Sequence, residues 1–326
     1  MARQTRVSNA SMMTFSEKLS RFSVALFIPM CLVLATSIVV LYSAGGGAWR
    51  PFALSQLLKI LIGFAVFFFA AFTNIKTWIK SAYVIYAIAL VLIILVTFVG
   101  HTGMGAQRWL NLGFIHVQPS ELIKIALVLA LARYFAWMNS VELSQLKNYI
   151  VPITMLLVPF GLIVMQPDLG TALSMGMITV GMFYIVGAQK KWFIIGIVLG
   201  LMAMPVVWYG GLYDYQRDRI ITFINPDHDA QGAGYQINQA KIAFGSGGLT
   251  GKGYLKGSQS QQSFLPEKQT DFIFTMLGEE FGFIGAFGLI AVYAWIILVL
   301  FWCAKTCRNR FGQLICFGFI DRKSVV

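Results

Sequence analysis

Long apolar segments recur along most of this chain, and they limit its possible folds more than any other feature. Each is close to the roughly 20 residues that a helix needs to cross about 30 Å of hydrocarbon. Only 12% of the residues are charged, far fewer than a soluble domain of this size carries. The pattern predicts an all-α, polytopic membrane bundle with about eight or nine spans. The apolar segments are 22–44, 54–72, 81–99, 119–137, 150–166, 170–187, 191–209, 283–303 and a segment from 311 onward.

The formal net charge of +12 does not indicate nucleic-acid binding, because the basic residues follow the predicted membrane topology. Most Lys and Arg residues of the termini and short loops fall on one side of that topology, and the short loops opposite hold only Arg50 and Arg108. Positive residues collect on the cytoplasmic side, so the N-terminus is predicted to lie inside and the large loop 210–270 outside. The first apolar segment lacks a small-residue cleavage site, which favours a retained span over a signal peptide.

The domain organisation follows from these segments. Residues 1–21 are predicted to form a cytoplasmic N-terminal segment, and residues 22–320 a single transmembrane domain. The span that begins at Phe311 turns polar after about ten residues, too few to cross a bilayer. We therefore expect that the natural protein continues and that residues 321–326 are a non-native tail. Within the large loop, residues 234–244 predict an amphipathic surface helix.

Asp271 is the first candidate for catalysis. A continuous helix over 271–303 would measure about 50 Å, too long for one span, so Asp271 is expected above the hydrocarbon on the outer side. A carboxylate flanked by apolar residues at this boundary is suited to act as a general base. The alternative is that Asp271 only caps the start of the following helix.

Two further carboxylates, Glu279 and Glu280, lie about two turns deeper in the same segment. Carboxylates close to the apolar layer are costly, so they are usually functional or paired. Solvation at the interface is the alternative. Gly278 and Gly282 are expected to open the helix beside them.

A polar group precedes the span at 119–137. Pro119 suits a first helical turn, and Glu121 complements the positive end of the helix dipole. Glu121 and Lys124 share a helix face and are expected to neutralise one another, in a structural or a functional role. Ahead of them, Arg108 is a candidate phosphate ligand. Trp109 is expected either to anchor at the interface or to stack on a sugar.

Other polar residues mark the predicted outer side. Asp168 lies in the tight turn between two spans and either caps the next helix or lines a polar cavity. Arg217, Arg219 and Lys268 are candidates for binding a pyrophosphate group, although a mutually paired surface cluster is the alternative. No metal site is predicted, because the three histidines lack metal-ligand spacing.

Five blocks of sequence resemble those of the SEDS family, which includes RodA, FtsW and SpoVE, and they occur in the family's order. The form SQSQQSFLPEKQTDFIF at 258–274 is most similar to the rod-elongation (RodA) branch. The blocks are GAQRWLNLG at 105–113, QPSELIK at 118–124, QPDLGTAL at 166–173, GAGYQINQAKIAFGSGGLTGKG at 232–253 and FLPEKQTDFIFTMLGEEFGFIG at 264–285.

The resemblance implies a peptidoglycan glycosyltransferase that polymerises lipid II into glycan strands during cell elongation. It implies a bacterial cytoplasmic (inner) membrane location with the active face outside, and a complete fold of about ten spans. Asp271 matches the family's essential aspartate and is expected to act as the general base. The resemblance supports Arg108, Glu121, Lys124 and Asp168 as binding or cavity residues. Together with the candidates taken from the residues alone, Trp109, Arg217, Arg219, Lys268 and Glu280, they form the expected substrate-binding or cavity set.

The resemblance also implies a divalent cation, Mg or Mn, although the sequence identifies no ligands for it. The implied partner is a class B penicillin-binding protein of the elongation complex. Two other functions remain open on sequence grounds: a flippase that transports lipid II, and a non-catalytic scaffold of the cell-wall machinery. The outer position of Asp271 and the long loop on one face favour the enzyme, because a transporter needs polar groups along its whole crossing.

Overall fold

The computed structural model describes residues 23–99, 101–103, 106–111, 116–229, 232–258 and 268–324. The chain divides into two compact units, and two of its helices contribute residues to both. Unit 1 comprises Met1–Phe72 and Leu201–Ile296, and unit 2 comprises Thr73–Gly200 and Ile297–Val326.

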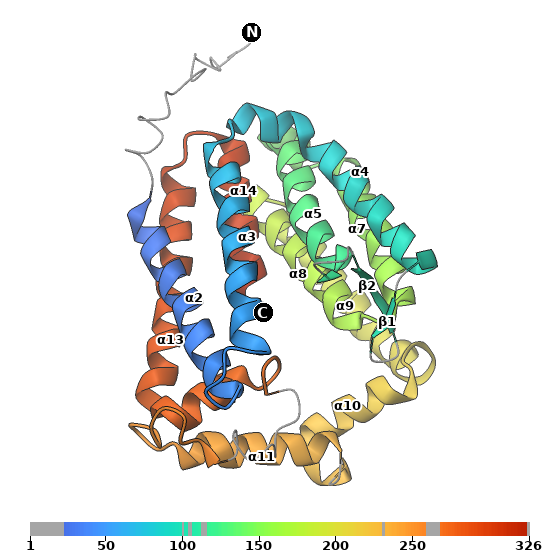
Figure 1. Ribbon diagram of the computed structural model, residues 1–326. Helices are drawn as coiled ribbons and strands as arrows, with labels where there is room; N and C mark the ends of the chain where they lie inside the picture. The colour runs from blue at the N-terminus through green and yellow to red at the C-terminus, as the bar shows by residue number, and fades with distance from the viewer. Residues whose placement is uncertain are drawn as a thin grey trace. The chain divides into compact units, whose positions relative to one another are not determined.

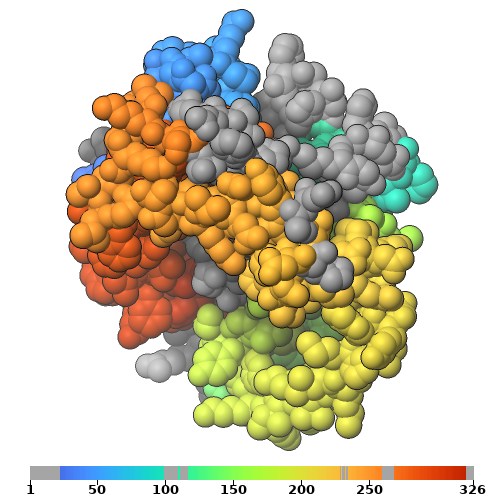
Figure 2. Space-filling model, turned by 90° about the horizontal axis from the view of Figure 1, so that it is seen from below, coloured from blue at the N-terminus to red at the C-terminus, as the bar shows by residue number. Residues whose placement is uncertain are grey.

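Unit 1 combines two apolar N-terminal helices, the helices of the predicted large loop and most of the longest helix (Figure 1). They are α2 (Val24–Ala44), α3 (Phe52–Phe72), the π-helical turn η2 (Val207–Gly211), α10 (Asp214–Ile224), η3 (Pro226–Asp229), α11 (Ala233–Ser246) and α13 (Ile273–Thr306). The predicted surface helix is α11, which runs crosswise to α2 and α13 in Figure 1. Figure 2 shows α10 (yellow) and α11 (orange) next to each other on one face of this unit.

Unit 2 is a bundle of apolar helices with a small antiparallel sheet. Its helices are α4 (Ile75–Val99), α5 (Pro119–Phe135), α6 (Ser140–Leu143), η1 (Leu146–Tyr149), α7 (Ile150–Met165), α8 (Leu169–Val186), most of α9 (Lys190–Val206) and α14 (Arg310–Ser324). The strands are β1 (His101–Gly103), β2 (Ala106–Asn111) and β3 (His116–Val117), in the order β1-β2-β3. They fall in the segment between α4 and α5, which lies between two of the predicted apolar segments.

The helices confirm the predicted polytopic membrane fold. Seven helices of the described residues are long and apolar enough to cross a membrane. The 17-residue α5 and the apolar part of α14, Arg310–Ile320, add two shorter apolar helices. On α9 no residue is buried, as expected of a helix that faces lipid, and the described spans mostly expose large apolar side chains.

The core of unit 2 is built around α5. This helix is buried nearly all round, from Ile123 to Phe135, and its alanines allow neighbouring helices to approach closely. The last helix, α14, packs on it through Gly318, where an added Cβ would lie 2.5 Å from a methyl group of Val128. In Figure 1, α5 lies among α4, α7 and α8, which agrees with its burial. The polar first turn of α5 is thereby held on a rigid element.

The core of unit 1 lies where α2 meets the first turns of α13, in the cluster of Val40, Ala44, Met276 and Leu277. The helix α13 is interrupted at Gly282, which has a φ of 66° and a ψ of −165°. This break coincides with the predicted outer boundary of the span near residue 283. A short helical segment, Ile273 to Phe281, therefore precedes the long span and begins two residues after Asp271.

Candidate functional site

Asp271 lies in the turn that leads into α13, and its side chain is exposed. Because α13 begins at Ile273, Asp271 lies one residue before the N-cap position, and the capping alternative does not describe it. Within the part of the chain that the structure describes, its carboxylate forms no hydrogen bond or ion pair. The start of α13 is fixed against α11 by a stacked pair, Phe244 and Phe274, with ring centroids 5.8 Å apart. Asp271 is thus an available carboxylate at the end of an anchored helix.

The break in α13 leaves backbone groups on both sides of Gly282 without helical partners, as at any helix end. A glycine-rich turn over residues 247–253 supplies those partners. Two of its N–H groups donate to carbonyls before the break, and two of its carbonyls accept from N–H groups after it. The bonds join Lys252 N to Glu279 O (3.0 Å), Gly253 N to Glu280 O (3.1 Å), Phe283 N to Gly248 O (2.9 Å) and Ile284 N to Leu249 O (3.1 Å).

This close approach requires glycine at two positions of the turn. A Cβ on Gly247 would lie 2.1 Å from the carbonyl oxygen of Gly278, and a Cβ on Gly251 would lie 2.1 Å from that of Glu280. Gly251 also has a φ of 81°, in the left-handed region that favours glycine. The turn and the helical segment therefore form one hydrogen-bonded structure.

Glu279 is completely buried, with 0% of its surface exposed, and it forms an ion pair with Lys252. The Nζ–Oε1 distance is 2.9 Å. Ser258 completes the group, because its Oγ accepts from Lys252 Nζ at 2.7 Å and lies 3.2 Å from Glu279 Oε1 as a donor. The prediction that this carboxylate is paired is confirmed, and the alternative that it is solvated at the interface is wrong.

Glu280 is also buried, at 1% exposure, and Ser43 Oγ of α2 donates a hydrogen bond to its Oε1. Its other oxygen, Oε2, has no hydrogen-bond partner among the described residues. Burial, the Glu280 carboxylate and Tyr42 together raise the pKa of Tyr254, whose hydroxyl donates to the Val39 carbonyl at 3.0 Å. Glu280 therefore joins α13 to α2.

In unit 2, the predicted pair of Glu121 and Lys124 is confirmed in the first turns of α5. The Nζ–Oε1 distance is 2.6 Å, and Lys124 is 5% exposed whereas Glu121 is half-exposed. Pro119 occupies the first helical turn, as predicted. Burial of the Lys124 ammonium is tolerated because the Glu121 carboxylate neutralises it.

Asp168 caps α8, as one of the two sequence interpretations predicted. Its carboxylate accepts from the Thr171 N–H at 3.3 Å and from the Thr171 hydroxyl at 2.9 Å. It also accepts from Gln118 Nε2 at 3.3 Å. Because Gln118 directly precedes α5, this contact brings two of the recognised sequence blocks together around the polar start of the bundle.

The remaining predicted residues differ in their surroundings. Trp109 lies on β2 and is 41% exposed, which suits both an interfacial anchor and a stacking surface. Arg108 lies on the same strand, but its side chain is outside the described parts of the structure. Arg217 pairs with Asp214 at 3.6 Å and donates to two backbone carbonyls, so the surface-cluster interpretation holds for it. Arg219 is exposed.

Lys268 lies in the turn before Asp271, is partly buried and has an interaction partner. The described residues contain no group of three His, Cys, Asp or Glu side chains that would hold a metal ion.

Sequence reasoning missed the residues that pair with the two buried glutamates: Lys252, Ser258 and Ser43. The signal for Lys252 was a lysine in a glycine-rich turn, in a sequence where two deeper carboxylates lacked predicted partners. Its true partner, Glu279, lies 27 residues away along the chain.

Comparisons with known proteins agree with this architecture. The peptidoglycan glycosyltransferase MrdB of Escherichia coli K12 is 36% identical over 314 residues, which cover 96% of this chain and 83% of MrdB. A chain from a peptidoglycan synthase complex, reported for its structural coordination of polymerization and crosslinking, has a TM-score of 0.74 at 26% identity. That match covers 92% of this chain and 84% of the other.

The fold also matches the crystal structure of the rod shape determining protein RodA of Thermus thermophilus. The TM-score is 0.67 at 24% identity, over 93% of this chain and 81% of that one. The model of the cell cycle protein family FtsW/RodA/SpoVE matches residues 17–321. The chain therefore belongs to the FtsW/RodA/SpoVE family.

Proposed function

We propose that this protein is a peptidoglycan glycosyltransferase that polymerises lipid II into glycan strands, with Asp271 as its general base. One observation carries the proposal: an exposed carboxylate without a partner among the described residues lies at the start of an anchored helix, in a chain that matches the glycosyltransferase MrdB over 96% of its length. A general base has to reach its substrate and be free to accept a proton. Among the predicted polar residues that the structure describes, Glu279, Glu280, Lys124 and Asp168 are already engaged.

The proposed reaction is an inverting displacement. The 4-hydroxyl of the acceptor GlcNAc attacks the anomeric carbon of the lipid-linked MurNAc, while Asp271 accepts the hydroxyl proton. A new glycosidic C–O bond forms, the bond to the pyrophosphate oxygen breaks, and lipid pyrophosphate leaves with its electron pair. Arg108, Arg219 and Lys268 are the proposed ligands of the pyrophosphate. Trp109 provides a surface for a sugar ring.

Glu121, Lys124 and Asp168 are proposed to organise the binding site rather than to react. Their contacts hold the start of α5 and the start of α8 in fixed positions. A Mg or Mn ion is expected to accompany the pyrophosphate, since the described residues do not fit a resident metal site. We assign no step to that ion.

The remaining parts of the proposal concern location and partner. We infer a bacterial inner membrane protein with a cytoplasmic N-terminus, because of the distribution of Lys and Arg. We infer a class B penicillin-binding protein as partner, since one similar chain belongs to a complex that couples polymerization to crosslinking.

The proposal is tested with purified protein, its penicillin-binding partner, labelled lipid II and a divalent cation, by gel analysis of glycan products. The assay uses this chain and a version extended at its C-terminus with the corresponding MrdB segment. Asp271→Asn should abolish the glycan ladder, whereas Asp218→Asn, which changes another exposed carboxylate, should retain it.

Equal ladders from folded Asp271→Asn and the parent protein would remove Asp271 from the chemistry. If no form makes ladders but liposomes containing the protein move lipid II between leaflets, the flippase alternative replaces the enzyme.

A further inference from the structure

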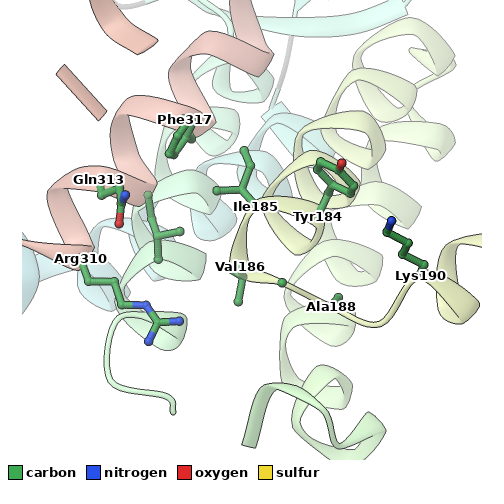
Figure 3. A pocket seen from close by; sticks show the side chains of 10 residues that line it. Tyr184, Ile185, Val186, Ala188, Lys190, Arg310, Gln313 and Phe317 are labelled. Carbon is green, nitrogen blue, oxygen red and sulfur yellow. The ribbon is translucent and has the colours of Figure 1, made fainter. Parts of the chain in front are cut away.

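Unit 2 contains a second site, a cavity of about 690 Å³ where three apolar helices end or begin. Its volume lies within the range of about 300–1,000 Å³ that is usual for small-molecule sites. Figure 3 shows side chains of α14 on one side of it and side chains of α8 and the following turn on the other. The lining residues are Tyr184, Ile185, Val186, Gly187, Ala188, Lys190, Arg310, Gln313, Leu314 and Phe317.

Two cations and no carboxylate line this cavity. Arg310 donates to the Met138 carbonyl, which orients its guanidinium and leaves its other N–H groups without partners among the described residues. Lys190 is exposed and forms no ion pair in the described parts. Gln313 and Tyr184 add neutral hydrogen-bonding groups. The cavity therefore favours an anion.

The position of the cavity relative to the membrane helices further restricts the class of anion that it can bind. α8 ends at Val186, α9 begins at Lys190 and α14 begins at Arg310, so the charged residues lie where these helices end, on the predicted cytoplasmic side. Phe317 lies seven residues beyond Arg310, about 10 Å further along α14 at 1.5 Å per residue. The lining is thus cationic at the helix ends and apolar deeper in the bundle.

We propose that this cavity binds the phosphate headgroup of an anionic phospholipid of the inner leaflet, with acyl chains running toward Phe317 and Tyr184. Basic pockets between membrane helices on the cytoplasmic side bind such headgroups. Inorganic phosphate shares the headgroup chemistry, but it would make no use of the apolar part of the lining. The site is separate from the proposed glycosyltransferase residues, and its test does not depend on that activity.

General attraction between cytoplasmic basic residues and the membrane surface is the competing explanation. Lys191 and Arg308 provide the matched control, because they belong to the same helix ends but do not line the cavity. Lys191 instead lies over the ring of Trp192, 4.9 Å from its centroid. Lys190→Gln/Arg310→Gln and Lys191→Gln/Arg308→Gln change the net charge equally.

The test measures binding of phosphatidylglycerol and of phosphatidylcholine with the same chains, by native mass spectrometry of protein purified in a neutral detergent. The parent protein should bind phosphatidylglycerol more tightly than phosphatidylcholine. At about 1 kcal/mol per basic residue, the Lys190→Gln affinity should fall about five-fold and the Lys190→Gln/Arg310→Gln affinity about 25-fold. The control pair should keep most of the parent's affinity. Lys190→Gln keeps the result interpretable if Arg310→Gln disturbs folding, because the exposed Lys190 side chain forms no ion pair or hydrogen bond with the described residues.

Three results would each overturn the proposal. Equal losses in the test and control pairs would leave only general surface charge. Displacement of phosphatidylglycerol by millimolar inorganic phosphate would make the cavity a free-anion site. Loss of binding in the version extended with the MrdB segment would show that protein, rather than lipid, covers the cavity.

Discussion

Replacing Lys252 with methionine would keep its aliphatic stem but remove the ammonium group that pairs with Glu279. The Glu279 side chain is fully buried, whereas the Lys252 side chain keeps 28% exposure, so water reaches the cation but not the carboxylate. Breaking a buried ion pair from one side costs about 3–5 kcal/mol, because the remaining charge is uncompensated. We expect about 3 kcal/mol for Lys252→Met, at the lower end, because Ser258 remains as a donor to Glu279.

Removing the carboxylate instead of the cation, with Glu279→Gln, should lower the free energy of unfolding by less. The Lys252 ammonium stays partly hydrated, and glutamine keeps a hydrogen-bonding oxygen, so a loss of about 1–2 kcal/mol is expected. The double variant Lys252→Met/Glu279→Gln has no buried charge at this position and should be more stable than Lys252→Met alone.

The free energy of unfolding is measured by denaturant titration in a mild detergent, with Lys241→Met as the control. Lys241 is an exposed lysine of α11, and its replacement should change the stability by less than about 0.5 kcal/mol. A loss below about 1 kcal/mol for Lys252→Met, or a larger loss for Glu279→Gln, would contradict the assignment of Glu279 as a buried charge that depends on Lys252.

Three further changes follow from the same structure. Gly251→Ala should cost at least about 2 kcal/mol, because its Cβ would lie 2.1 Å from the Glu280 carbonyl oxygen at a φ of 81°; a thermal transition unchanged from the parent would contradict this. Asp168→Ala should cost about 1 kcal/mol of unfolding free energy through loss of the α8 cap, with faster amide exchange confined to the first turn of α8. Glu121→Gln should cost about 3 kcal/mol, because the buried Lys124 ammonium loses the carboxylate that neutralises it; Lys124→Met/Glu121→Gln should recover part of the loss in the same titration.

The sequence predicts those features that depend on residues close together along the chain. Membrane helices can be predicted because the length of each apolar run indicates by itself whether it can cross the hydrocarbon. The pair of Glu121 and Lys124 is visible because its spacing places both on one helix face. The cap at Asp168 can be predicted because an aspartate stands just before an apolar helical segment. Each depends on no more than a few neighbouring residues.

The partners of the buried glutamates could not be predicted in this way. Lys252 reaches Glu279 across 27 residues, and Ser43 reaches Glu280 across 237. Gly282 was expected to open the helix, yet the sequence gives no indication that a glycine-rich turn fills the opening with backbone hydrogen bonds. Such contacts depend on tertiary packing, because no local periodicity relates the two segments.

The break at Gly282 has a consequence for the proposed base. Without it, Asp271 would lie at the end of one continuous helix, and every tilt of the lipid-facing span would move the carboxylate. With it, the segment from Ile273 to Phe281 is held by the glycine-rich turn at one end and by the stacking of Phe244 on Phe274 near the other. The position of Asp271 then depends on the glycine-rich turn and on α11 rather than on the tilt of the span. Lys252→Met should therefore lower the turnover rate of glycan synthesis even at temperatures where the variant remains folded, because a general base that is displaced by about 1 Å loses much of its effect.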